Sequence, residues 1–93
     1  MSDSLSSPIS KLVQQLADKL LAKKIIISTA ESCTGGWISQ SLTAVSGSSA
    51  WFDSGFVTYS NEAKQRLLNV PPVLFSIDGP GAVSEATVLA MTA

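Results

Sequence analysis

The middle of the chain holds the three side-chain types that acyl transfer without histidine requires: serine, tyrosine and lysine. Ser48 and Ser49 stand in a Gly-Ser-Ser turn, and Tyr59 and Lys64 follow further along. A lysine amine can take the proton of a serine hydroxyl where burial disfavours its charged form. A tyrosine can relay that proton or donate a hydrogen bond to developing charge. The competing interpretation is structural: the serines cap a turn, Tyr59 is an interfacial aromatic, and Lys64 is a solvated helix residue.

The chain contains no histidine and one cysteine. The lack of histidine excludes Ser-His-Asp and Cys-His catalysis and removes the commonest metal ligand. A zinc site built almost wholly from carboxylates is improbable, so we expect no metal and no other cofactor. Hydrolysis here must therefore use Ser, Thr, Tyr, Lys or carboxylate groups.

A second candidate site is the stretch Thr29-Ala30-Glu31-Ser32-Cys33-Thr34-Gly35-Gly36-Trp37-Ile38. It has the form of a strand that feeds a tight turn into a helix N-terminus, where backbone N–H groups favour an anion. The stretch therefore predicts a small-molecule site for an anionic group. Capping alone explains many such turns, and that interpretation has equal weight. We interpret Cys33 as a small structural residue, because no histidine is present to act as its base.

Composition indicates one folded domain: the chain has 93 residues, of which 45% are hydrophobic and 14% charged. The net charge is −1 and no Lys/Arg cluster occurs, which argues against a nucleic-acid partner. No apolar run approaches the roughly 20 residues that span a bilayer, so we expect no membrane partner. The N-terminus does not resemble a signal peptide. With a single cysteine, this predicts a cytoplasmic protein.

Periodicity predicts the elements that must position these residues. Residues 1–7 form a loose leader, and Ser7-Pro8 begins an amphipathic helix that ends near Lys23. A buried strand over 25–29 and a helix over 36–45 follow. A strand over 51–59 has Trp51 and Phe52 in the core and a bulge or close approach at Gly55. Trp37 and Phe56 either pack within the fold or stack on an aromatic ring of a ligand.

Later elements are marked by caps and breakers. Ser60 caps a helix over 61–68 that Asn69 and Pro71-Pro72 end. Residues 73–77 form a brief extended piece or turn, Asp78-Gly79-Pro80-Gly81 is a loop, and Ser84 with Glu85 begins a last helix. The order predicts an α/β fold with a layered sheet. Because two strands alone make no stable open sheet, we expect the layered fold to be incomplete in this chain and to self-associate as a homo-oligomer.

Four segments together resemble one known family, the C-terminal domain of the CinA (competence/damage-inducible) proteins, which includes nicotinamide-nucleotide amidohydrolases. The resemblance covers residues 8–93. It rests on Ala30-Glu31-Ser32-Cys33-Thr34-Gly35-Gly36, Gly47-Ser48-Ser49-Ala50-Trp51-Phe52, Gly55-Phe56-Val57-Thr58-Tyr59-Ser60-Asn61-Glu62-Ala63-Lys64 and Gly81-Ala82-Val83-Ser84-Glu85.

The resemblance implies an α/β/α sandwich, of which residues 8–93 form the N-terminal part, and hydrolysis of nicotinamide mononucleotide to the nicotinate form and ammonia in pyridine-nucleotide salvage. The nucleophile maps onto Ser49, with Ser48 as the alternative, and its activating partners onto Tyr59 and Lys64. The substrate-binding residues that it implies are Ser32, Thr34, Gly35, Gly36 and Ser48.

The chain departs from the family pattern before Gly81-Ala82-Val83-Ser84, where relatives usually carry a histidine and this chain has Asp78-Gly79-Pro80. The alternative hypothesis is therefore a catalytically inactive, ligand-binding or vestigial CinA-like protein.

Overall fold

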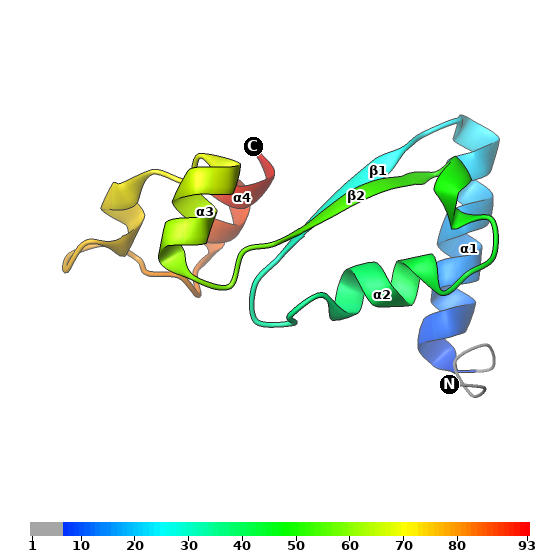
Figure 1. The fold of residues 1–93 in the computed structure, drawn as a ribbon, viewed down its shortest axis with the longest axis horizontal. Helices are drawn as coiled ribbons and strands as arrows, with labels where there is room; N and C mark the ends of the chain where they lie inside the picture. Colours follow the sequence, from blue (N-terminus) through cyan, green and yellow to red (C-terminus); the bar gives the residue numbers. More distant parts are fainter. Residues whose placement is uncertain (1–6) are drawn as a thin grey trace. The chain divides into compact units, whose positions relative to one another are not determined.

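The computed structural model describes residues 7–93, which form two compact units (Figure 1). Unit 1 holds the described residues up to Thr29 together with Gly36–Gly55, and unit 2 holds Ala30–Gly35 and Phe56–Ala93. Of the leader predicted over residues 1–7, residues 1–6 lie outside the described part.

Unit 1 begins with helix α1, Pro8–Lys23, as the sequence predicts. The hydroxyl of Ser7 accepts a hydrogen bond from the backbone N–H of Ser10 at 3.1 Å, which satisfies one of the free donors of the first turn. At the other end Lys24 adopts a left-handed conformation with φ 56°. The backbone N–H of Ile25 then bonds to the carbonyl of Leu20 at 3.0 Å and closes the helix.

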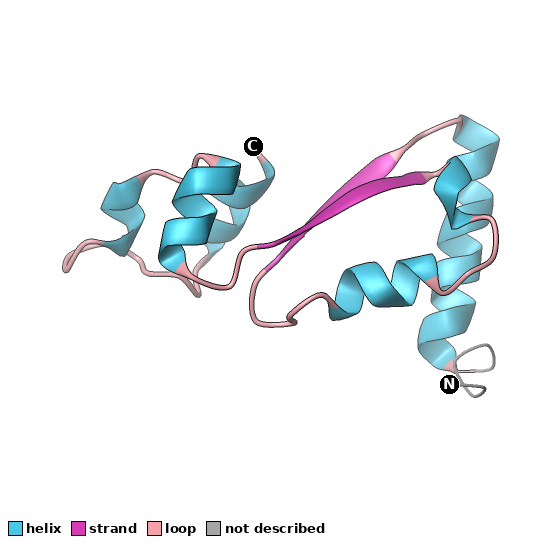
Figure 2. Cartoon of the chain, in the orientation of Figure 1, coloured by secondary structure: helices cyan, strands magenta, loops and turns pink. Residues whose placement is uncertain are grey.

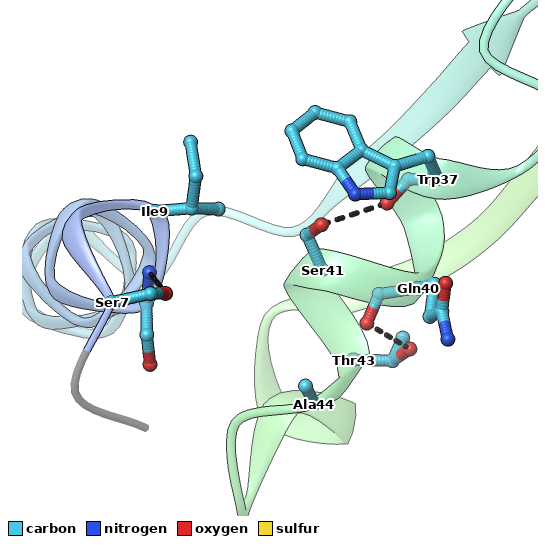
Figure 3. Close-up of a pocket in the computed structure, with 8 residues that line it drawn as sticks. Ser7, Ile9, Trp37, Gln40, Ser41, Thr43 and Ala44 are labelled. Carbon is cyan, nitrogen blue, oxygen red and sulfur yellow. Dashed lines mark hydrogen bonds between the residues drawn. The ribbon is translucent and has the colours of Figure 1, made fainter. Parts of the chain in front are cut away.

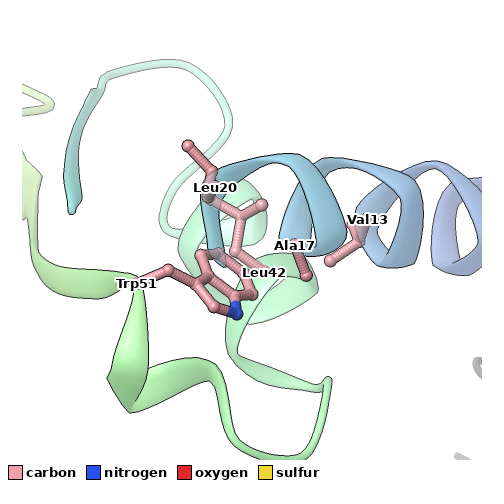
Figure 4. Close-up of a cluster of buried hydrophobic side chains, with 5 residues drawn as sticks. All are labelled: Val13, Ala17, Leu20, Leu42 and Trp51. Carbon is pink, nitrogen blue, oxygen red and sulfur yellow. The ribbon is translucent and has the colours of Figure 1, made fainter. Parts of the chain in front are cut away.

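The apolar side of α1 packs on helix α2, Trp37–Thr43, which is shorter than the predicted span of 36–45. Five buried side chains form the core of unit 1 (Figure 4): Val13, Ala17, Leu20, Leu42 and Trp51. Trp51 is 1% exposed, and Phe52 packs against the cluster with Ile27 and Val45. The prediction of a core position is confirmed for Trp51, while Phe52 is partly buried at the edge of the core.

Strands β1, Ile27–Glu31, and β2, Phe52–Val57, pair in a two-stranded sheet (Figure 2). Ile27 N–H bonds to the Trp51 carbonyl and Thr58 N–H to the Glu31 carbonyl, both at 2.8 Å, so the strands run parallel. The predicted start of the first strand was wrong. Ile25 and Ile26 are 44% and 65% exposed, because the left-handed closure of α1 uses these residues in the connection.

Gly55 is a site of close approach, as predicted. A Cβ at this position would clash with the Ser39 hydroxyl and lie 3.0 Å from the Thr29 hydroxyl. These two hydroxyls bond to each other at 2.9 Å. Only glycine therefore lets β2 pass over this polar pair of unit 1.

Unit 2 contains helix α3, Asn61–Leu68, packed on helix α4, Glu85–Thr92. The hydroxyls of Ser60 and Ser84 cap the two helices by accepting from the N–H groups of Ala63 and Thr87. Between the helices, the segment predicted as extended or a turn forms the short 3₁₀ helix η3, Pro72–Phe75. Helices and a parallel sheet make the chain an α/β protein, as predicted.

Candidate functional site

Lys64 is buried in unit 2, with 1% of its surface exposed. Its Nζ donates to the Thr58 carbonyl at 2.8 Å and to the Tyr59 carbonyl at 3.0 Å. The interpretation of Lys64 as a solvated helix residue is therefore wrong. The amine is held by the backbone that leads from β2 into α3, because Ser60 caps the helix immediately after these two carbonyls.

Tyr59 meets Lys64 through its backbone and not through its ring. The residue is 73% exposed, the largest exposure among the aromatic residues that the described chain presents to solvent. The structure thus brings together two of the residues predicted from the sequence, and it leaves the tyrosine hydroxyl accessible to a ligand.

Ser48 and Ser49 belong to unit 1, in the short 3₁₀ helix η2, Ser48–Ala50. Gly47 precedes it with φ 80°, a left-handed conformation that glycine adopts without strain. Ser48 is half-buried and Ser49 is exposed. The backbone of Ser48 also holds the turn, because its carbonyl accepts from the Trp51 N–H at 3.0 Å.

The glycine-containing turn follows β1, as the sequence predicts. Gly35 and Gly36 have φ 61° and 102°, so both positions require the left-handed region that glycine enters freely. Gly35 N–H bonds to the Ser32 carbonyl at 3.0 Å, and the Thr34 hydroxyl donates to Glu31 Oε1 at 2.7 Å. Cys33 is a free, exposed cysteine in this turn, so it fills no core position.

Sequence reasoning missed two buried polar residues of unit 2, Glu31 and Thr58, which are 2% and 0% exposed. The Glu31 carbonyl accepts from the N–H of Thr58 at 2.8 Å and from its hydroxyl at 3.3 Å. The available signal was the carboxylate of Glu31, two residues after Thr29 at the end of the apolar run and followed by Ser32 and Thr34. A buried carboxylate needs hydrogen-bond donors, and such a turn supplies them.

A groove of about 430 Å³ lies in unit 1 between the start of α1 and α2 (Figure 3). The indole of Trp37, which is 50% exposed, stands at its edge. Ser41 and Thr43 also line the groove, and each hydroxyl donates a hydrogen bond to a backbone carbonyl of α2 at 2.8 Å. Trp37, which the sequence offered as a possible stacking aromatic, is one of the residues that line the groove: Ser7, Ile9, Ser10, Trp37, Gln40, Ser41, Thr43 and Ala44. The catalytic and substrate-binding residues implied by the family resemblance do not line it.

Within residues 7–93 no group of three or more His, Cys, Asp or Glu side chains is placed to hold a metal ion. No helix in that part of the chain is both long and apolar enough to span a membrane.

The model of one protein family, the CinA C-terminal domain, matches residues 9–93. The chain belongs to this family. The solved structures agree: a competence damage-inducible protein A from Klebsiella pneumoniae superimposes with a TM-score of 0.85 at 38% identity, over 91% of this chain and 52% of that one. A competence/damage inducible protein from Agrobacterium tumefaciens also gives 0.85, at 42% identity, over 91% of this chain and 50% of that one.

Among curated CinA-family relatives, nicotinamide-nucleotide amidohydrolase PncC of Pseudomonas putida is 51% identical over 84 residues, which are 90% of this chain and 51% of the relative. The Escherichia coli K12 protein of the same name is 46% identical over 85 residues, 91% of this chain and 50% of the relative. The chain therefore spans about half the length of the curated relatives it matches.

Proposed function

We propose that this chain carries the reactive residues of an amidohydrolase that converts nicotinamide mononucleotide and water to nicotinate mononucleotide and ammonia, in pyridine-nucleotide salvage. The proposal is supported by the 51% identity to a relative named for that activity. The structural observation that carries it is the burial of Lys64, whose Nζ is held by two carbonyls.

The chemistry of a neutral lysine amine suits this arrangement. Its two N–H groups can donate to the carbonyls of Thr58 and Tyr59, and its lone pair then occupies the remaining tetrahedral position. In the proposed reaction Lys64 has the role of the base and Ser49 that of the nucleophile, whose oxygen attacks the amide carbon of the substrate.

The remaining steps need only these side chains and water. Attack by Ser49 forms a tetrahedral intermediate, and the exposed Tyr59 hydroxyl donates a hydrogen bond to its developing charge. The proton held by Lys64 passes to the leaving nitrogen, the carbon–nitrogen bond breaks, and ammonia departs. Water then hydrolyses the acyl-serine ester, which releases nicotinate mononucleotide and regenerates the Ser49 hydroxyl. The cycle uses no cofactor, and we place it in the cytoplasm.

Ammonia release from nicotinamide mononucleotide by the purified chain tests the proposal, with Ser49→Ala and Ser48→Ala as a matched pair. We expect Ser49→Ala to abolish turnover, and Ser48→Ala to raise KM and leave kcat within a few-fold. Equal activity of Ser49→Ala and wild type would remove Ser49 as the nucleophile. Saturable substrate binding by the wild-type chain without ammonia would favour the inactive, ligand-binding relative instead.

A further inference from the structure

Thr34 is an exposed residue whose hydroxyl is already committed. It donates to Glu31 Oε1 at 2.7 Å, and a hydroxyl has a single hydrogen to donate. Phosphate oxygens at neutral pH are chiefly acceptors, so in this conformation Thr34 has no hydrogen left for them. The resemblance implies that Thr34 binds substrate, and the observed hydrogen bond leaves its hydroxyl with no hydrogen to donate to the nucleotide.

Glu31 connects this turn to the backbone that holds Lys64. Its carboxylate accepts a hydrogen bond from the Thr34 hydroxyl, and its main-chain carbonyl accepts one from the N–H of Thr58 at 2.8 Å. The carbonyl of Thr58 in turn accepts a hydrogen bond from Lys64 Nζ at 2.8 Å. All four residues belong to unit 2, and three of them are at most 2% exposed: Glu31, Thr58 and Lys64.

The inner part of this network is shielded from water. Breaking the buried bond between Lys64 Nζ and the Thr58 carbonyl is costly, because water does not replace it. The exposed Ser32–Gly35 turn is thus fastened at Thr34 to a buried polar network. Within the turn itself, the Gly35 N–H bonds to the Ser32 carbonyl at 3.0 Å.

We propose that Glu31 and Thr34 are positioning residues, which hold the Ser32–Gly35 turn in the conformation that binds the nucleotide, and that the Thr34 hydroxyl serves this bond and does not donate to the nucleotide. The inference rests on the proposed function for the identity of the ligand, but the fastening of the turn is a property of the free chain. The two can therefore be measured separately.

The test compares Thr34→Val, which keeps the shape and removes the hydroxyl, with Thr34→Ser, which keeps the hydroxyl. Amide hydrogen exchange at Gly35, followed by NMR on the full chain without ligand, measures how often the hydrogen bond that closes the turn opens. We expect Thr34→Val to accelerate exchange about tenfold, as loss of one hydrogen bond implies. Thr34→Ser should restore wild-type exchange, and Cys33→Ser in the same exposed turn is the matched control that should leave it unchanged.

Kinetics with nicotinamide mononucleotide then separates positioning from direct contact. Positioning predicts that Thr34→Val raises KM by about the factor seen in exchange, with kcat within twofold of wild type, and that Thr34→Ser restores both. A raised KM with unchanged Gly35 exchange would overturn the inference and make Thr34 a direct ligand. A wild-type chain that releases no ammonia would refute the proposed function, and the exchange measurement would still decide the fastening of the turn.

Discussion

The Nζ atom of Lys64 lies 3.0 Å from the carbonyl oxygen of Tyr59, while the residue that supplies this carbonyl is 73% exposed. The backbone and the ring of Tyr59 therefore have separable tasks. The backbone carbonyl at position 59 can hold the lysine whatever the side chain, and the tyrosine ring presents its phenolic hydroxyl to a ligand.

Tyr59→Phe should consequently reduce activity without loosening the site. We expect kcat for ammonia release to fall by about 100-fold, the scale of a lost proton-transfer or hydrogen-bonding group. The free energy of unfolding should change by less than about 0.5 kcal/mol, because the side chain is exposed and the carbonyl remains. Turnover and urea denaturation measure the two effects, and an unchanged kcat would remove the hydroxyl from the mechanism.

Lys64→Met should lower stability, because Met fills a similar volume and leaves the carbonyls of Thr58 and Tyr59 without their donor. The expected loss is about 2 kcal/mol of unfolding free energy, measured as a lower denaturation midpoint. Lys11→Met, on the exposed side of α1, is the control and should remain within about 0.5 kcal/mol of wild type. Equal stability of both variants would mean that the buried contacts of Lys64 contribute nothing net.

Gly55→Ala should destabilise unit 1 by about 2 kcal/mol, because the added methyl clashes with the Ser39 hydroxyl. Combining it with Ser39→Ala removes that oxygen, and the double variant should recover part of the loss in a double-mutant cycle. Strictly additive effects would contradict the steric explanation. Gly47→Ala provides a contrast, because its Cβ meets nothing within 4 Å and only its φ of +80° opposes the substitution.

Self-association is expected from the apolar side chains that α1 and α2 present to solvent: Leu12 and Trp37 are 60% and 50% exposed. Sedimentation at micromolar concentration should show a species larger than the monomer. Leu12→Glu should shift it toward monomer, and Gln14→Glu, which adds the same charge at an exposed polar position of α1, should not. A compact monomer for the wild-type chain would refute this expectation.

Helix starts were predictable because their signals are local. Ser7-Pro8, Ser60 and Ser84 each combine a capping hydroxyl with a helix-compatible sequence, and each begins a helix in the structure. The start of β1 was predicted two residues early, since nothing in the residue type of Lys24 signals its left-handed conformation. Only glycine and asparagine are usual at that position.

The polar network of unit 2 was hidden for the opposite reason. Lys64 lies in a helix of mostly polar residues, Asn61–Leu68, for which an exposed lysine is the ordinary expectation. The burial of Lys64 depends on where the carbonyls of Thr58 and Tyr59 point. The contacts of Glu31 depend on Thr58, which is far along the chain. Such tertiary contacts leave no periodic pattern in a single sequence.

The division into two units has a consequence for dissecting the protein by proteolysis. The chain passes from one unit to the other between residues 29 and 30, 35 and 36, and 55 and 56. Neither unit is a continuous segment, so no single cleavage releases either of them intact. A cut after Gly55 separates Phe56–Ala93 from Ala30–Gly35, the other segment of unit 2. Glu31 and Thr34, which bond to each other, both lie in Ala30–Gly35, so the freed fragment loses the Glu31 carbonyl to which Thr58 bonds.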